Sequence, residues 1–288
     1  MGQDTEITID EFVDIFLNIY GEIDQKRSIE QLWLQVVEES ASIAEAVREI
    51  EYTNLTMHIA DMFCWFCGFI NKLKTEKRKE FRIDDPLSLI IWNKFPNKCP
   101  FCQTHPCQCL LKREEIQGRT SEEKNRIYEN VAKQAEATKN YRIKELNKLC
   151  DMFRCIFRPS YYVMPLEEIT FHFMEEIGEV SEHIRKLTSL SLGKKKGQNE
   201  LLKVKKDFKK EIADVFSWLC AIVIKLNYLL ESNQKILDEF NYLDSQKIEI
   251  SFIDIVKKYY FKDSKFICRT CKREKCDISK HKTYYQLK

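Results

Sequence analysis

Carboxylate side chains recur at helical spacing in two apolar stretches of the second half of the chain. The first stretch contains Glu175-Glu176-Ile177-Gly178-Glu179, and the second contains Glu211-Ile212-Ala213-Asp214. Residues three and four apart share a helix face, so two helices packed on their apolar stripes would bring these acids together. Two like charges about 4 Å apart repel by roughly 4 kcal/mol at an effective dielectric of 20. The cluster therefore requires shared protons or a cation, for which Mg²⁺ or Mn²⁺ suits the oxygen ligands; a solvated acidic helix face is the alternative.

The order EExxE followed by ExxD resembles the signature of the MazG-like all-α nucleoside triphosphate pyrophosphohydrolases. The resemblance implies that a metal-activated water attacks the α-phosphorus of a nucleoside triphosphate and releases a nucleoside monophosphate and pyrophosphate. It implies that Glu175 holds a second ion or orients the water; the sequence does not separate these roles. The residues implied to bind Mg²⁺ (or Mn²⁺) are Glu176, Glu179, Glu211 and Asp214.

Basic residues follow the first acidic stretch. Cations beside a polyphosphate would stabilise the charge that develops on it. The loop Gly193–Gly197 is then either a lid over the phosphates or a solubilising surface loop. The candidate substrate-binding residues are Arg185, Lys186, Lys194, Lys195 and Lys196.

Cysteines are clustered in two places. A CxxC followed by CxC supplies four thiolates for a closed tetrahedral zinc site, at Cys99, Cys102, Cys107 and Cys109. The spacing of the first three recurs at Cys268, Cys271 and Cys276. His281 is the candidate fourth ligand there, with Asp277 second, and a vestigial knuckle without metal is the alternative. A redox CxxC normally opens a helix after a strand, and no strand is expected here.

The two halves of the chain resemble each other. A shift of 137 residues aligns Glu38 and Glu39 with the first two acids of EExxE, and a shift of 153 aligns Ile59-Ala60-Asp61-x-Phe63-x-Trp65-x-Cys67 with the same pattern from Ile212. Ser42 stands where Glu179 stands, and His58 stands where Glu211 stands. Because hydroxyl and imidazole suit Mg²⁺ poorly, we expect the first half to be degenerate; a hybrid site for a different metal is the alternative.

These patterns predict an all-α fold in which two repeated helical units form a pseudo-dimeric bundle, each unit ending in a small zinc knuckle. Low contents of Gly (7) and Pro (6) favour helices. The expected domains are a degenerate MazG-like repeat at 1–110 (the first half), a charged linker helix at 111–148, and a catalytic repeat at 149–288 (the second half). The resemblance implies a nucleotide pocket between units, so the first half would wall the pocket and position the substrate.

Composition restricts the class of protein. A net charge of +2 gives no global signal for nucleic-acid binding. No signal peptide is apparent, and Asp214 and Lys225 break the longest apolar run, so we expect a cytoplasmic protein without a membrane span whose 12 cysteines stay reduced. The alternative function is a catalytically inactive, zinc-stabilised helical scaffold that binds a nucleotide or protein partner. Further homo-oligomerisation stays open.

Overall fold

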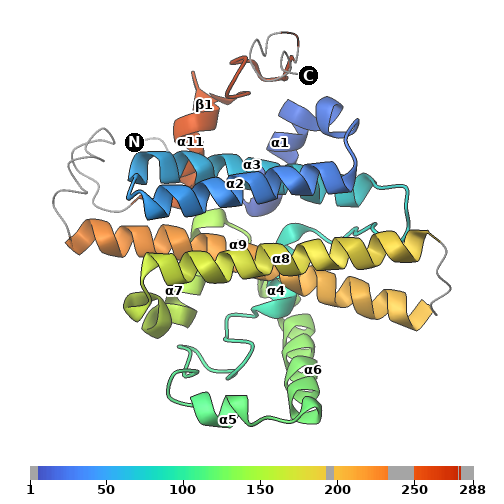
Figure 1. The fold of residues 1–288 in the computed structure, drawn as a ribbon, viewed down its shortest axis with the longest axis vertical. Helices are drawn as coiled ribbons and strands as arrows, with labels where there is room; N and C mark the ends of the chain where they lie inside the picture. Colours follow the sequence, from blue (N-terminus) through green and yellow to red (C-terminus); the bar gives the residue numbers. More distant parts are fainter. Residues whose placement is uncertain (1–5, 193–197, 233–249, 278, 280–288) are drawn as a thin grey trace.

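The computed structural model describes residues 6–192, 198–232, 250–277 and 279. Helices dominate this part of the chain, which confirms the all-α class. Helices α2 (Ile29–Arg48) and α3 (Tyr52–Thr75) form one hairpin. Helices α8 (Leu166–Ser191) and α9 (Gln198–Ser232) form a second pair, and the two pairs pack together through α2 and α8 (Figure 1). The central bundle is thus built from one helix pair of each half.

Shorter helices cover the bundle. Helix α1 (Ile9–Asp24) packs on α3, and α7 (Leu146–Val163) packs on α9. Helix α4 (Leu87–Lys94), however, packs on α9 of the second half. Helix α11 (Phe252–Tyr260) packs on α3 of the first half. Each half therefore lends one helix to the other.

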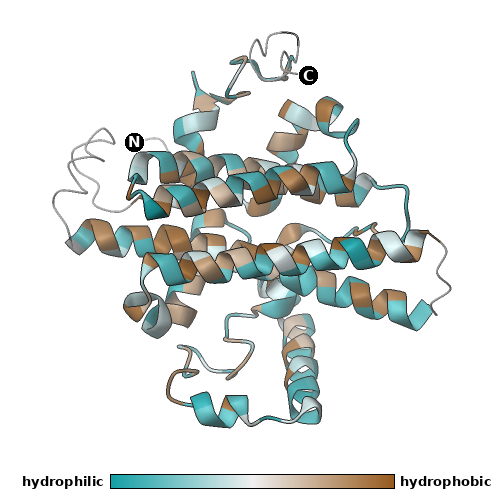
Figure 2. Cartoon of the chain, viewed as in Figure 1, coloured by the Kyte–Doolittle hydropathy of each residue, from teal (hydrophilic) through white to brown (hydrophobic). Residues whose placement is uncertain are grey.

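A smaller helical segment projects from the bundle near α4. It contains α5 (Arg113–Gln117), α6 (Ser121–Thr138) and the 3₁₀-helix η1 (Lys139–Tyr141), and α6 contacts α4 (Figure 1). Only Val131 and Ala135 of α6 are buried, and most of its residues are hydrophilic (Figure 2). Helix α6 thus meets the bundle through a narrow apolar line.

Capping boxes mark where several helices begin, at Thr8, Ser28 and Thr120. In each, the hydroxyl accepts the N–H of the third helical residue, whose side chain accepts the cap residue's own N–H. These reciprocal bonds satisfy donors that the first helical turn leaves without partners. Ser251 caps α11 in the same way.

Aromatic rings fill the core between the halves. Phe63 on α3 and Phe216 on α9, which match under the 153-residue shift, have ring centroids 6.5 Å apart. Phe252 of α11 contacts both rings, at 5.0 and 6.3 Å. All three rings are fully or almost fully buried. The core is therefore shared by both halves.

Helix α9 is long and apolar enough, by length and composition, to cross a bilayer. In the fold, 78% of its apolar window is buried inside the protein. The core helix of a soluble protein has the same appearance.

The loops that carry the cysteines are also exchanged between halves. The N–H of Cys107 donates to the carbonyl of Ile156 on α7 at 2.6 Å, and the N–H of Cys276 donates to the carbonyl of Ile19 on α1 at 2.8 Å. A short hairpin of β1 (Phe261–Lys262) and β2 (Lys265–Phe266) leads into the second loop.

Candidate functional site

Three of the predicted acids converge at the edge of the α8–α9 pair. Glu176 of α8 and Glu211 and Asp214 of α9 each offer a carboxylate oxygen, and these oxygens lie within 4.8 Å of one another. Apolar residues one or two positions away, among them Ile177 and Ile212, are buried in the core. Burial of those stripes turns the acids toward one partly buried position. We call these three residues the second-half cluster.

Lys94 is the cation of the second-half cluster. It lies at the C-terminal end of α4 and forms an ion pair with Asp214, its side chain being only 10% exposed. Burial lowers the pKa of Lys94 to about 8, and the nearby carboxylates of Glu211 and Glu176 oppose that shift. A residue of the first half thus completes a site of the second half.

Burial makes the charged form of the carboxylates in the second-half cluster unfavourable. Burial raises the pKa of Glu176 to about 7; Lys94 acts in the opposite direction, and repulsion from Glu179 and Glu211 adds to the rise. Burial also raises the pKa of Glu211, with repulsion from Glu179. One lysine therefore compensates this concentration of negative charge only in part.

The two other acids of the motif lie differently. Glu179 is exposed, but its side chain contacts Glu211. Glu175 is exposed and hydrogen-bonds to His172, with Oε2 and Nδ1 2.8 Å apart. His172 in turn stacks on Trp218 with ring centroids 4.8 Å apart. The structure brings Glu179 to the border of the second-half cluster and leaves Glu175 outside it.

Of the predicted phosphate-binding cations, the structure describes Arg185 and Lys186, and neither forms an ion pair with an acid of the second-half cluster. Arg185 is exposed, and nine residues at roughly 100° each set it on the side of α8 opposite Glu176. Lys186 pairs with Glu182 one turn earlier, at 2.8 Å. Three lysines of the proposed lid and the candidate zinc ligand of the second cysteine loop lie outside the described residues: Lys194, Lys195, Lys196 and His281.

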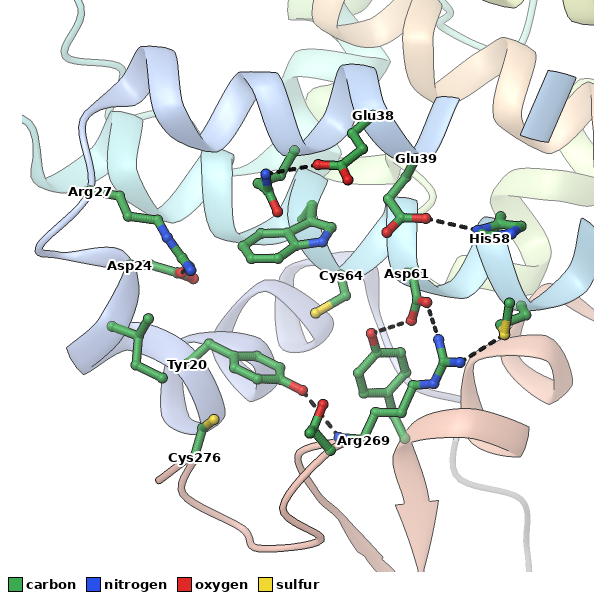
Figure 3. A pocket seen from close by; sticks show the side chains of 16 residues that line it. Tyr20, Asp24, Arg27, Glu38, Glu39, His58, Asp61, Cys64, Arg269 and Cys276 are labelled. Carbon is green, nitrogen blue, oxygen red and sulfur yellow. Dashed lines mark hydrogen bonds and ion pairs between the residues drawn. The ribbon is translucent and has the colours of Figure 1, made fainter. Parts of the chain in front are cut away.

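Residues at the matching positions of the first half also converge. Glu39, His58 and Asp61 offer ligand atoms within 4.8 Å of one another. His58 Nδ1 lies 2.9 Å from Glu39 Oε2. Asp61 accepts a hydrogen bond from the Tyr260 hydroxyl at 2.7 Å and forms an ion pair with Arg269 (Figure 3). We call Glu39, His58 and Asp61 the first-half cluster; its two outer partners come from the second half.

A cavity of about 510 Å³ opens at the first-half cluster. It lies between α1, α2 and α3 on one side and α11 with the second cysteine loop on the other (Figure 3). Tyr20 and Trp65 contribute aromatic surface to its wall. This cavity faces polar residues of the first half. That the first half also walls a pocket for the second half stays a prediction.

The cysteine loops have the geometry of zinc ligands. The four sulfurs of Cys99, Cys102, Cys107 and Cys109 lie within 4.8 Å of one another, as do those of the second loop's three cysteines. The N–H of Gln108 donates to Cys102 Sγ at 3.3 Å. Such bonds favour a thiolate, and they lower the pKa of Cys102 although burial alone would raise it. Both clusters are compatible with zinc.

The second cysteine loop repeats the turn of the first. The N–H of Gln103 donates to the carbonyl of Cys99 and that of Lys272 to the carbonyl of Cys268, both at 2.9 Å, and both donor residues have φ of 58°. Asp277, the second choice for a fourth ligand, pairs with Arg273 at 2.9 Å.

Sequence reasoning did not find Lys94, Tyr128 or Arg269. The ammonium of Lys210 lies over the ring of Tyr128 on α6, 4.7 Å from the ring centroid. Tyr128 is also near enough to Glu211 and Glu179 for their charges to act on it. For Lys94, the available sequence signal was a single lysine at the end of an apolar helix, in the segment Trp92-Asn93-Lys94. No local pattern links these residues to their acids, which lie from about 50 to about 200 positions away in the sequence.

Comparison with protein-family models, with curated proteins and with solved structures finds no match to this chain. The resemblance in the motifs therefore rests on the residues named above.

Proposed function

We propose that the protein is a divalent-metal-dependent nucleoside triphosphate pyrophosphohydrolase that uses the second-half cluster. The observation that carries the proposal is the convergence of Glu176, Glu211 and Asp214 from two helices, with Lys94 beside them. Carboxylates that are buried together and incompletely compensated favour the binding of a further cation. Their oxygens match the preference of Mg²⁺ for hard ligands.

Four acids would hold the metal: Glu176, Glu179, Glu211 and Asp214. A bound Mg²⁺ would polarise the phosphoryl oxygens and make a bound water more acidic. A bound metal would neutralise the acids. The ammonium of Lys94 would then compensate the negative charge of the phosphates instead of that of Asp214. Tyr128 of α6 and Lys210 of α9 would border the same position. Glu175, bound to His172, would have no contact with the reacting atoms.

The proposed architecture is a tandem duplication with structural zinc in both cysteine loops. The matched sequence positions, the exchange of α4 and α11, and the matched turn bonds of the two loops support it. A degenerate first half then has a use, because it supplies Lys94 to the catalytic half.

The test is a panel of canonical and modified nucleoside triphosphates with Mg²⁺, scored for monophosphate and pyrophosphate. Glu211→Gln should reduce turnover at least about a hundredfold, since it removes a metal ligand without changing side-chain size. Glu175→Gln is the matched control and should keep most of the activity, because Glu175 lies outside the cluster. Equal losses in both variants would contradict the site.

A second candidate is the zinc-stabilised scaffold that binds a nucleotide without turning it over. The ion pair between Lys94 and Asp214 favours it, because a lysine can serve as the permanent cation of the cluster. Saturable nucleotide binding with no pyrophosphate from any member of the panel would favour this second function.

A further inference from the structure

The first-half cluster combines one imidazole with two carboxylates and opens into the large cavity. His58 and Glu39 are partly buried, with side chains 23% and 20% exposed, and Asp61 is 15% exposed. These three come from α2 and α3, which pack tightly as a helix hairpin. The donor atoms are therefore held by two rigid elements and not by a loop.

The donor set of the first-half cluster differs in kind from that of the second-half cluster. Imidazole nitrogen binds Zn²⁺, Co²⁺ and Fe²⁺ well, whereas Mg²⁺ prefers oxygen ligands and retains its waters. His58 Nδ1 and Glu39 Oε2 lie 2.9 Å apart, a separation that suits two ligands of one ion, which would take the place of the proton between them. The substitution of Glu by His at this repeat position thus changes which metals the site prefers.

The cavity at the first-half cluster is acidic and wide. Its wall carries two further acids, Asp24 and Glu38, so carboxylates outnumber the two arginines that reach it, Arg27 and Arg269. A volume of about 510 Å³ exceeds what a single ion requires, so an ion at the cluster would keep open positions for water or a small ligand. Trp65 lines the same space, and Tyr20 offers a second flat surface there (Figure 3).

Arg269 is the cation already present at this cluster. Its guanidinium pairs with Asp61, and a second nitrogen of the same group lies 2.7 Å from Met57 Sδ. Arg269 belongs to the second cysteine loop, which reaches the cavity from the other half. A metal ion and this guanidinium would compete for the same carboxylate.

We propose that the first-half cavity is a separate metal-binding pocket for a borderline divalent transition ion, held by His58 with Glu39 and Asp61 and in competition with Arg269. The pocket does not depend on hydrolysis at the second-half cluster.

The test adds Co²⁺ to the full chain after both cysteine loops have been filled with zinc. Cobalt in the cavity should give weak d–d absorption without thiolate-to-metal charge-transfer bands, which would report exchange into the cysteine loops. His58→Ala should weaken this binding at least about tenfold. Glu176→Gln, which changes the second-half cluster, is the matched control and should leave the signal intact. A tenfold excess of Mg²⁺ should not displace the ion.

A gain of affinity separates the proposal from damage to the fold. Arg269→Met removes the competing charge and keeps a side chain of similar length, so it should tighten Co²⁺ binding severalfold. Unchanged binding in His58→Ala, or loss of the signal in Glu176→Gln, would overturn the proposal. Weaker binding in Arg269→Met at unchanged helix content would also overturn it, because the arginine would then support the ion.

Discussion

Asp61 and Asp214 occupy matching positions on α3 and α9, and each pairs with a cation from elsewhere in the chain. Lys94 reaches Asp214 from α4, and Arg269 reaches Asp61 from the second cysteine loop. Removing one member of a buried pair leaves the other charge uncompensated, which is costly. The two pairs therefore couple each cluster to the half that does not contain its acids.

Asp24 gives the protein a predictable dependence of stability on pH. Burial raises its pKa to about 6, although Arg27 and Lys72 act to lower it. A folded-state pKa above the unfolded value means that the folded state binds the proton more tightly. The charged carboxyl therefore costs stability in full above pH 6, and the cost is relieved as the pH falls toward 4.

We predict that the unfolding free energy of the wild type, measured relative to Asp24→Asn, rises by about 2 kcal/mol as the pH falls from 7 to 4. Urea unfolding of both proteins at several pH values measures this difference, and the subtraction removes the titration of other groups. A constant difference across this range would show that Asp24 titrates as an ordinary exposed carboxyl.

At the residue scale, spacing predicted that the cysteines of each loop would gather and that the three acids of the second-half cluster would converge. Helical periodicity is sufficient there, because the acids lie on two helices with clear apolar stripes, beginning at Ile177 and Ile212. The spacing also assigned a role at the cluster to Glu175, which shares the motif but hydrogen-bonds to His172. Lys94 and Arg269 were not predicted, because tertiary packing alone brings them to the acids.

At the scale of elements, local sequence explains where several helices begin but not which half they cover. Thr8 and Ser28 cap their helices by accepting hydrogen bonds from residues three positions later. The choice between packing α4 on α3 or on α9 depends on surfaces about a hundred residues apart. Apolar periodicity is the same in either arrangement, so the exchange of α4 and α11 could not be predicted.

Gly68 tests how closely α1 and α3 approach, and Gly178 on α8 is a control in open space. A Cβ at Gly68 of α3 would lie 2.8 Å from Asp24 Oδ2, whereas a Cβ at Gly178 of α8 would meet nothing within 4 Å. Alanine is favoured over glycine in both helices by about 0.5–1 kcal/mol. We expect Gly178→Ala to raise the unfolding free energy by that amount.

Gly68→Ala should instead lower the unfolding free energy by about 1–3 kcal/mol, because the added methyl group displaces a carboxylate anchored by Arg27. Denaturant unfolding of both variants measures the contrast. Similar gains in both would show that α1 can move away from α3 at no cost.

At the scale of the whole molecule, the halves are interlocked and not merely adjacent. Each half lends a helix and a cysteine loop to the other, and the two halves share one aromatic core around Phe63 and Phe216. If the second half unfolded, the apolar face of α4 would lose its contact with α9. If the first half unfolded, the apolar face of α11 would lose its contact with α3. Elements that share their buried surface in this way lose it together.

We therefore predict that the chain unfolds in one cooperative transition, tested at the matched core positions Ile59 and Ile212, both fully buried. Each alanine substitution should lower the unfolding free energy by about 2–5 kcal/mol, as loss of a buried aliphatic side chain does. Calorimetry should show one peak in the wild type and one shifted peak in each variant, with calorimetric and van't Hoff enthalpies in agreement. If Ile59→Ala moved one peak and Ile212→Ala a different one, the halves would be independent domains, and first-half residues such as Lys94 would be unsuited to complete a second-half site.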